Sequence, residues 1–414
     1  MGSDQMGYIA VENLERGMVL EEDVYDINTR LLLSKGQKIA NNHLRILKIW
    51  GVSEVKVVGS DTTAAGSQGG IDNEKTEGIK NAIDLVFKNA DFAHSTLKEI
   101  CKVALIHRIK GDFTISPRLN CISGSQDMQS KSKVVSGHIK GIEDKLPEAP
   151  TIISELNQVI SDPLATSNDV ARVVNTSPSL AATLLKIVNS AYYGFPSKID
   201  RISRAVTIIG TKEISSLALG ISVMQTFKDI PKHIIDMQAF IRHSLACGII
   251  ARILAARNNL PQTEQLFVSG LLHDIGKLIV YSCYPEYATV CFCQAESSNT
   301  SVFQTEKNII GMNHPQLAKH LLSKWKLPMD LTDNIIYHHA PSRASNSDTA
   351  GIVHLADIIS QGLGIGYSGE RSIPHFDYPV MDKIVDSRHS IQMVVRQAVH
   401  QLGPMEAIFK GQAN

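Results

Sequence analysis

The sequence predicts an all-α main domain behind a small N-terminal α+β unit. From Leu146 onward, apolar residues recur at helical spacing, as in Leu180, Leu184 and Ile187. No alternating run rich in Val and Ile interrupts this part of the chain. Residues 7–58, by contrast, hold short β-prone runs separated by turn residues. At 414 residues, the chain is long enough for two or three such units.

The N-terminal unit is predicted to contain strands and one helix. Its β-prone runs are Met18–Tyr25, Arg30–Leu33 and Val55–Val58, with turns at Asp26–Thr29 and Lys35–Gly36. Either Asn41 or Asn42 can cap a helix that Gly51 would end. This arrangement predicts a small α+β domain over residues 7–58.

Three segments join this unit to the main domain. Residues 59–75 are rich in Gly, Ser, Thr, Asp and Asn, so we predict a linker there. Residues 76–109 have a helical pattern, which we expect to break into two helices near Asn89–Asp91. Residues 110–137 are predicted to form a second flexible segment.

The main domain, residues 146–362, is predicted to consist of helices throughout. Ser177 followed by Pro178 is typical of a capped helix start. Later helices are predicted at about 201–209, 212–227, 234–257, 263–282, 285–297, 314–324, 329–338 and 350–362. Residues 363–414 are predicted to form a C-terminal extension with a helix near 390–402.

Composition excludes several classes of protein. Lys plus Arg and Asp plus Glu both total 41, so the formal net charge is zero. The net charge therefore gives no attraction to nucleic acid or to an anionic membrane. The first residues lack the basic and apolar regions of a secretory signal. Apolar runs such as Gly248–Ala256 are too short to span a bilayer, and the six cysteines show no disulfide rhythm. We therefore expect a cytoplasmic protein without a nucleic-acid or membrane partner.

The pentad His273-Asp-Ile-Gly-Lys277 carries the strongest chemical signal in the chain. It lies in an apolar stretch, where a buried carboxylate without a partner would cost several kcal/mol. On a helix, Lys277 shares a face with His273 and Asp274. His273 and Asp274 are common metal-ligand types, and the Lys277 ammonium lies beside them. This combination would suit an anionic substrate such as a phosphate. Lys277 is alternatively a solvated helix residue or a salt-bridge partner of Asp274.

Further histidines and one aspartate stand in apolar helical contexts around this pentad. With His273 and Asp274, the candidate ligands are His243, His314, His338, His339 and Asp357. Any one of these is more often a satisfied core residue than a ligand. A helical core offers few hydrogen-bond partners for seven such residues, so a shared cation explains them better. Histidine with carboxylate suits Fe, Mn, Zn or Ni, and His354 would support a ligand rather than bind.

These residues resemble two related families. The order His243, His273-Asp274, Asp357 resembles the HD metal-dependent phosphohydrolase superfamily, and the remaining histidines match extra ligands of its binuclear HD-GYP branch. Other motifs are similar to the HDOD domain (HD-related output domain) over about 146–362, namely Leu146-Pro-Glu-Ala-Pro150, Val188-Asn-Ser-Ala-Tyr192 and Ile202–Gly210. Residues 7–58 look like the small domain often found ahead of HD-GYP modules.

The resemblance implies an HD-type helical bundle with an N-terminal helical subdomain and two divalent cations. His243, His273 and Asp357 would hold one cation and His314, His338 and His339 the other, with Asp274 bridging them. In catalysis Asp274 and Lys277 would act together, Lys277 by neutralising a phosphoryl oxygen. The Asp-Gly-x-Gly-Tyr-Pro stretch of HD-GYP proteins does not follow His338-His339.

The family therefore implies more than one function. HDOD domains are generally signalling modules, which predicts a bacterial signal-transduction protein that acts by binding a signalling protein or a phosphorylated small molecule. The alternative is an active metal-dependent phosphohydrolase that cleaves a nucleotide or cyclic dinucleotide. A third reading is a helical scaffold with an empty site.

Overall fold

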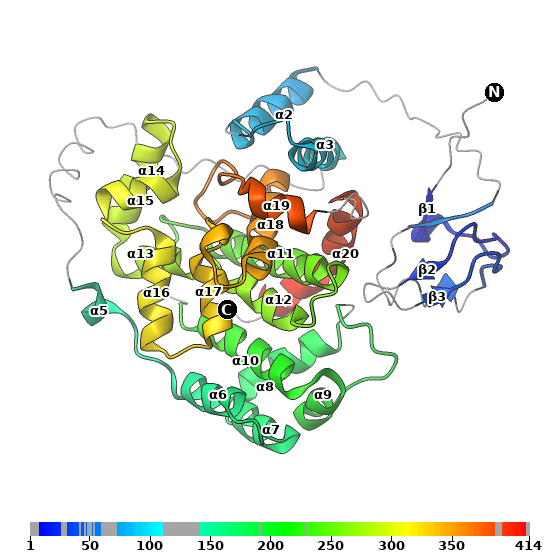
Figure 1. Cartoon of the computed structure of the whole chain (residues 1–414), viewed down its shortest axis with the longest axis horizontal. Coiled ribbons are helices and arrows are strands. Elements are labelled where there is room, and N and C mark those ends of the chain that lie inside the picture. The colour runs from blue at the N-terminus through cyan, green and yellow to red at the C-terminus, as the bar shows by residue number, and fades with distance from the viewer. Residues whose placement is uncertain are drawn as a thin grey trace.

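The protein is all-α in its main body, with strands confined to a small N-terminal region (Figure 1). The computed structural model describes residues 8–25, 31–40, 43, 44, 47, 52, 54–58, 73–88, 90–110, 141–190, 192–227, 230–385 and 391–410. Within these residues, the body and the N-terminal region have separate hydrophobic cores.

The N-terminal strands pair in two antiparallel ladders. Strand β1 (Tyr8–Ala10) pairs with β4 (Glu54–Lys56), and β2 (Val24–Tyr25) pairs with β3 (Leu31–Leu33). A short 3-10 turn, Val11–Asn13, follows β1. Strand β1 was not predicted, because a three-residue strand leaves almost no alternation to read. The predicted turn at 26–29, both candidate caps, residues 59–72 of the linker and residues 111–137 lie outside the described residues.

The body is built from helices along its whole length. In chain order they are α2 (Asn73–Val86), α3 (Ser95–Lys110), α5 (Ile142–Lys145), α6 (Thr151–Ser161), α7 (Ser167–Asn175), α8 (Pro178–Val188), α9 (Ile202–Ile209), α10 (Thr211–Gln225), α11 (Met237–Arg257), α12 (Thr263–Leu272), α13 (Ile275–Cys283), α14 (Pro285–Ser297), α15 (Val302–Ile309), α16 (His314–Lys324), α17 (Met329–Ile336), the 3-10 turn Pro341–Arg343, α18 (Ser347–Leu363), α19 (Tyr378–Ile384) and α20 (Ile391–Lys410). From residue 141 on, the described chain contains no strand.

Local sequence signals explain where several helices begin. Ser177 accepts a hydrogen bond from the backbone N–H of Leu180 at the start of α8, with Pro178 as first helical residue. Asn313 and Gln316 form a capping box that starts α16 at His314. The predicted break in residues 76–109 is confirmed, because α2 ends at Val86 and α3 begins at Ser95.

Other boundaries differ from the prediction. The helix expected over 263–282 is two helices, α12 and α13, with His273 and Asp274 at their junction. Helices α15 and α19 were not predicted, because each is only about two turns long. Helix α20 extends to Lys410, well past the expected end near 402. The junction matters most, because the backbone leaves helical geometry at Asp274, while His273 keeps helical backbone angles.

Helix α11 is the centre of the body and packs against α12, α18 and α20 (Figure 1). It approaches α12 closely where Gly270 has no side chain, since a Cβ there would lie 2.7 Å from the carbonyl oxygen of Cys247. Helices α6 to α9 lie at one end of the body, and α2 with α3 at the other (Figure 1). Three helices that meet in this core, α11, α12 and α18, carry or adjoin the candidate ligands.

Two stretches are long and apolar enough to cross a membrane, Met237–Arg257 and Thr263–Cys283. Met237–Arg257 is longer than Gly248–Ala256, the apolar run that the sequence predicted to be too short to span a bilayer. Their apolar windows are 83% and 89% buried inside the protein, so core packing already accounts for their composition.

Candidate metal centre

All seven predicted ligands converge in the core of the helical body. His243 comes from α11, His273 and Asp274 from the α12–α13 junction, and Asp357 from α18. His314 begins α16, and the pair His338-His339 follows the end of α17. Six of the seven are at most 1% exposed, and only His339 is partly exposed. Residues more than 100 positions apart thus form one buried cluster.

Asp274 lies between two sets of histidines. Its Oδ2 is 3.3 Å from His273 Nε2 and 3.9 Å from His243 Nε2. Its Oδ1 is 3.3 Å from His314 Nε2 and 3.9 Å from His338 Nε2. Each oxygen of one carboxylate therefore contacts a different set, which is the arrangement that a bridging ligand needs.

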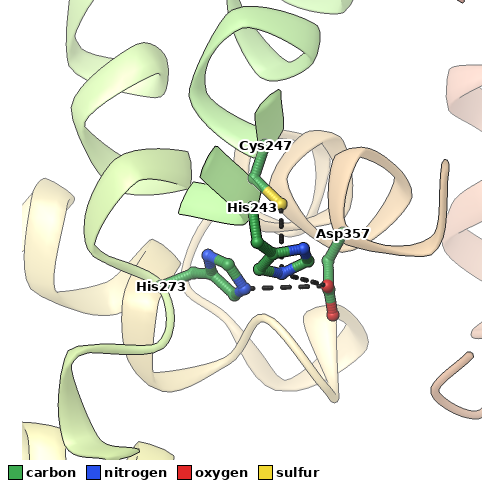
Figure 2. Close-up of side chains that lie close together, drawn as sticks. All are labelled: His243, Cys247, His273 and Asp357. Carbon is green, nitrogen blue, oxygen red and sulfur yellow. Dashed lines mark hydrogen bonds and ion pairs between the residues drawn. The ribbon is translucent and has the colours of Figure 1, made fainter. Parts of the chain in front are cut away.

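Asp357 contacts the two histidines that lie near Asp274 Oδ2, His243 and His273, which we call the first set. Its Oδ1 is 3.3 Å from His243 Nε2 and 3.6 Å from His273 Nε2 (Figure 2). The same oxygen accepts a hydrogen bond from Gln361 Nε2 at 2.9 Å. Gln361 is one turn further along α18, so helix geometry fixes how this carboxylate faces the histidines.

Hydrogen bonds fix the orientation of three imidazole rings. His273 donates through Nδ1 to the carbonyl of Gly270, and His338 donates through Nδ1 to the carbonyl of Ile335. The Nδ1 of His314 donates to Glu306 Oε2 at 2.7 Å. In the neutral form of each ring the Nε2 lone pair then faces the cluster, which is how protein histidines are usually prepared to bind a metal.

Lys277 is a salt-bridge partner of Asp274 and not a solvated helix residue. Its Nζ lies 2.8 Å from Asp274 Oδ2 and 3.2 Å from Ser368 Oγ, and the side chain is 1% exposed. Tyr281 donates to the backbone oxygen of Ser368, which holds this loop against α13. The ammonium is thus buried beside the Asp274 carboxylate.

The charges of the cluster are strongly coupled. Burial alone would raise the pKa of Asp274, but His273 and Lys277 hold it well below its usual range. Burial likewise acts to raise the pKa of Asp357, and the nearby imidazoles of His243 and His273 hold it low. Burial and the neighbouring His273 lower the pKa of His338. Ionised carboxylates and neutral imidazoles are the protonation states that bind metal ions.

The residues present fit divalent cations. The atoms His273 Nε2, Asp274 Oδ1 and His338 Nε2 are buried and have no hydrogen-bond partner among the described residues. Nitrogen and oxygen ligands about 2.0–2.2 Å from one cation lie roughly 3.0–3.5 Å apart at ordinary coordination angles. Most separations in the cluster fall near that range, including 3.1 Å between the Nε2 atoms of His314 and His339. Buried His and Asp groups that could bind metal are therefore present.

Sequence reasoning missed three residues of this centre. Glu306 orients His314, but it lies on the unpredicted helix α15. Cys247 lies one turn after His243 on α11, a spacing that could have found it. Gln361 follows Asp357 by four residues, and nothing in the sequence singled it out. His354, expected to support a ligand, donates through Nδ1 to the carbonyl of His338.

The family match covers much of the helical body. Residues 146–341 match the model of the HDOD domain. This match does not include residues 7–58, so their similarity to a domain of HD-GYP proteins stays a prediction. A curated protein from Treponema pallidum (strain Nichols), described as uncharacterized, is 25% identical over 236 residues. The match covers 56% of this chain and 44% of that protein, which is less than half its length.

Solved structures with similar folds come from several bacteria. One described as a candidate signal transduction protein from Marinobacter aquaeolei VT8 is 21% identical, has a TM-score of 0.50, and is matched over 72% of this chain and 67% of its own. An HDOD domain protein with unknown function from Geobacter sulfurreducens is 20% identical with a TM-score of 0.49, covering 69% of this chain and 93% of that one. Residues 146–341 are therefore similar to the HDOD domain, and the Marinobacter structure shares the fold.

Proposed function

We propose that this chain is a bacterial signal-transduction protein whose HDOD domain holds two divalent cations and binds a phosphorylated small molecule. The observation that carries the proposal is the position of Asp274, with one carboxylate oxygen against each set of histidines. The two sets of histidines support the proposal of two ions. Their donor atoms suit iron, manganese, nickel or zinc.

The proposed division of ligands between the two cations is the one that the family resemblance implies. His243, His273 and Asp357 would hold the first; His314, His338 and His339 would hold the second, and Asp274 would contact both. Cations bound in this way supply Lewis-acid chemistry toward phosphoryl oxygens. The protein's own contribution is to fix each imidazole through its second nitrogen and to keep Lys277 charged nearby.

A cavity beside the centre suits a phosphorylated ligand. Its volume is about 460 Å³, within the range of small-molecule sites, and its lining reaches the centre at His243 and Gln361. Arg108 and Arg371 also line it. In the described part of the chain, Arg108 donates to the carbonyl of Gly362 and makes no ion pair with a carboxylate. This buried guanidinium is available to bind a phosphate.

Helix α2 closes the opposite side of the same cavity, through Asn81 and Leu85 among others. This helix lies outside the residues that match the HDOD model. A ligand in the cavity would contact both α2 and the edge of the metal centre. Such a position would let ligand binding change how α2 packs, which is what a signalling role requires.

Binding of this kind can be tested with a panel of nucleotides and cyclic dinucleotides and the manganese-loaded protein. We expect at least one of them to bind, and Arg108→Met to weaken it about tenfold or more, because a charge-assisted hydrogen bond is lost. Arg172→Met removes an exposed arginine on α7 and should leave the affinity unchanged. Isothermal titration calorimetry measures both affinities. Absence of binding at millimolar ligand would contradict a phosphorylated ligand.

Hydrolysis is a second candidate function, favoured by Lys277. Its ammonium is buried 2.8 Å from the bridging carboxylate, where it could neutralise a phosphoryl oxygen. Turnover of a phosphodiester by the metal-loaded protein, lost in Asp274→Ala, would establish it. A fully loaded protein that binds the ligand without cleaving it would leave the signalling role and exclude the enzyme.

Glu306 gives a sharper test of the second cation. One carboxylate oxygen accepts hydrogen bonds from both the ring and the backbone N–H of His314. We expect Glu306→Gln to weaken metal binding at this side about 10- to 100-fold, because the imidazole becomes less basic and less well oriented. Glu286→Gln, on the exposed face of α14, is the matched control. Zinc affinity is measured by calorimetric titration of each metal-free variant. If Glu306→Gln binds zinc as tightly as the original protein does, Glu306 does not support metal binding through His314.

A further inference from the structure

Cys247 faces the first set of ligands from the same helix as His243. It lies four residues after His243 on α11, and its Sγ is 3.5 Å from His243 Nε2. The side chain is fully buried. Figure 2 shows the sulfur, both imidazoles and the Asp357 carboxylate turned toward one another. The cysteine therefore belongs to the cluster by position and not only by sequence spacing.

The four side chains match the geometry of one shared cation. One ligand atom from each of His243, Cys247, His273 and Asp357 lies within 4.8 Å of the other three. A zinc ion with nitrogen at about 2.0 Å and sulfur at about 2.3 Å, and a tetrahedral angle between those two ligands, would place these two atoms roughly 3.5 Å apart. That value equals the distance between Cys247 Sγ and His243 Nε2.

A second observation points to a ligand in the same place. His273 Nε2 is completely buried and has no hydrogen-bond partner among the described residues, although it faces this group. Its other nitrogen already donates to Gly270, so in the neutral ring the unpartnered atom carries a lone pair. A sulfur, a lone pair and a carboxylate around one point form a donor set for a soft or borderline metal ion.

We propose that Cys247 binds, as a thiolate, the cation held by His243, His273 and Asp357. The inference rests on the proposed metal centre and adds a sulfur ligand to one side of it. Thiolate and imidazole favour zinc or iron, whereas manganese prefers carboxylate and water. The first position would then select zinc or iron more strongly than the second position, where three histidines and Asp274 provide no sulfur ligand.

Cobalt substitution tests the sulfur ligand directly in the full-length protein. Metal-free protein is loaded with Co²⁺, and its near-ultraviolet absorption is recorded for the thiolate-to-cobalt charge-transfer band. We expect the band in the original chain and in Cys291→Ser, which replaces another buried cysteine, on α14. It should disappear in Cys247→Ser and in Cys247→Ala.

Metal affinity provides an independent measurement. Cys247→Ser should weaken zinc binding at least about tenfold and change manganese binding far less, because only the soft metal loses a preferred ligand. If neither variant folds, X-ray absorption of the zinc-loaded original chain still tests the proposal, because the spectrum shows whether sulfur is bound to zinc.

The outcomes separate the two proposals. Stoichiometric cobalt without a thiolate band, or a band that survives in Cys247→Ser, overturns the sulfur ligand and leaves the metal centre intact. A protein that takes up no cobalt at all contradicts the metal centre, and the inference about Cys247 fails with it. A band that only Cys247 variants lose supports both.

Discussion

Replacing Gly276 by alanine should separate helix α13 from helix α16 and remove His314 from the metal centre. A Cβ on Gly276 would lie 1.8 Å from the carbonyl oxygen of His314 and 3.0 Å from the backbone nitrogen of Ala318. Both are backbone atoms, so no side chain can rotate away to relieve the overlap. Overpacking of a core usually costs about 1–3 kcal/mol, and a backbone overlap of this depth belongs at or above that range.

Gly78→Ala is the matched control. Gly78 lies within α2, where a Cβ would meet no atom within 4 Å. Alanine there should leave stability unchanged or raise it by up to about 1 kcal/mol through helix propensity. Urea unfolding and calorimetric metal titration measure the two effects. A Gly276→Ala protein with normal stability and a normal second metal would show that α13 and α16 do not meet as described.

Removing the bridging carboxylate should cost the protein both stability and metal. In Asp274→Ala, the buried ammonium of Lys277 keeps Ser368 but loses its salt bridge. Removing one partner of a buried ion pair typically costs about 3–5 kcal/mol. We expect a loss of that size in the metal-free protein, together with loss of the bound metal.

The double variant Asp274→Ala/Lys277→Met separates these two consequences. Methionine removes the unpaired charge, so the double variant should regain most of the stability lost by the single one. It should not regain metal, because the bridging ligand is still missing. Chemical unfolding with elemental analysis follows both properties. Equal stability of the two variants would contradict a buried Lys277–Asp274 pair.

The convergence of the seven candidate ligands could be predicted because most of them stand in an apolar helical context that offers few other partners. Whether a histidine or an aspartate is buried can be predicted from its neighbours in the sequence. Seven buried residues of this kind required a common explanation. Their division into two sets came from the family resemblance, and the two oxygens of Asp274 now give it a geometric basis. The roles of these residues in metal binding and catalysis stay predictions.

The missed residues show where local patterns stop being informative. Glu306 reaches His314 only because α15 packs beside the start of α16, and α15 is too short for a clear helical period. The cavity is lined by α2 and by the loop after α18, which are almost 300 residues apart in the chain. Contacts of this kind depend on tertiary packing, which one sequence does not display.

The junction at His273-Asp274 is another limit of the same kind. The apolar pattern continues across 263–283, so it predicted one helix. The structure ends α12 at Leu272 and begins α13 at Ile275. Interactions of the two polar side chains with the centre accompany this break, and hydrophobic periodicity contains no information about them.

The central claim, a centre with two cations bridged by Asp274, is tested most directly by anomalous scattering. Crystals of the full chain loaded with zinc or iron would be measured on both sides of the metal absorption edge. We predict two anomalous peaks, one on the His243–Asp357 side of Asp274 and one on the His314–His338 side. A map of loaded protein with no peak beside Asp274, or with a single peak on one side only, would contradict this account.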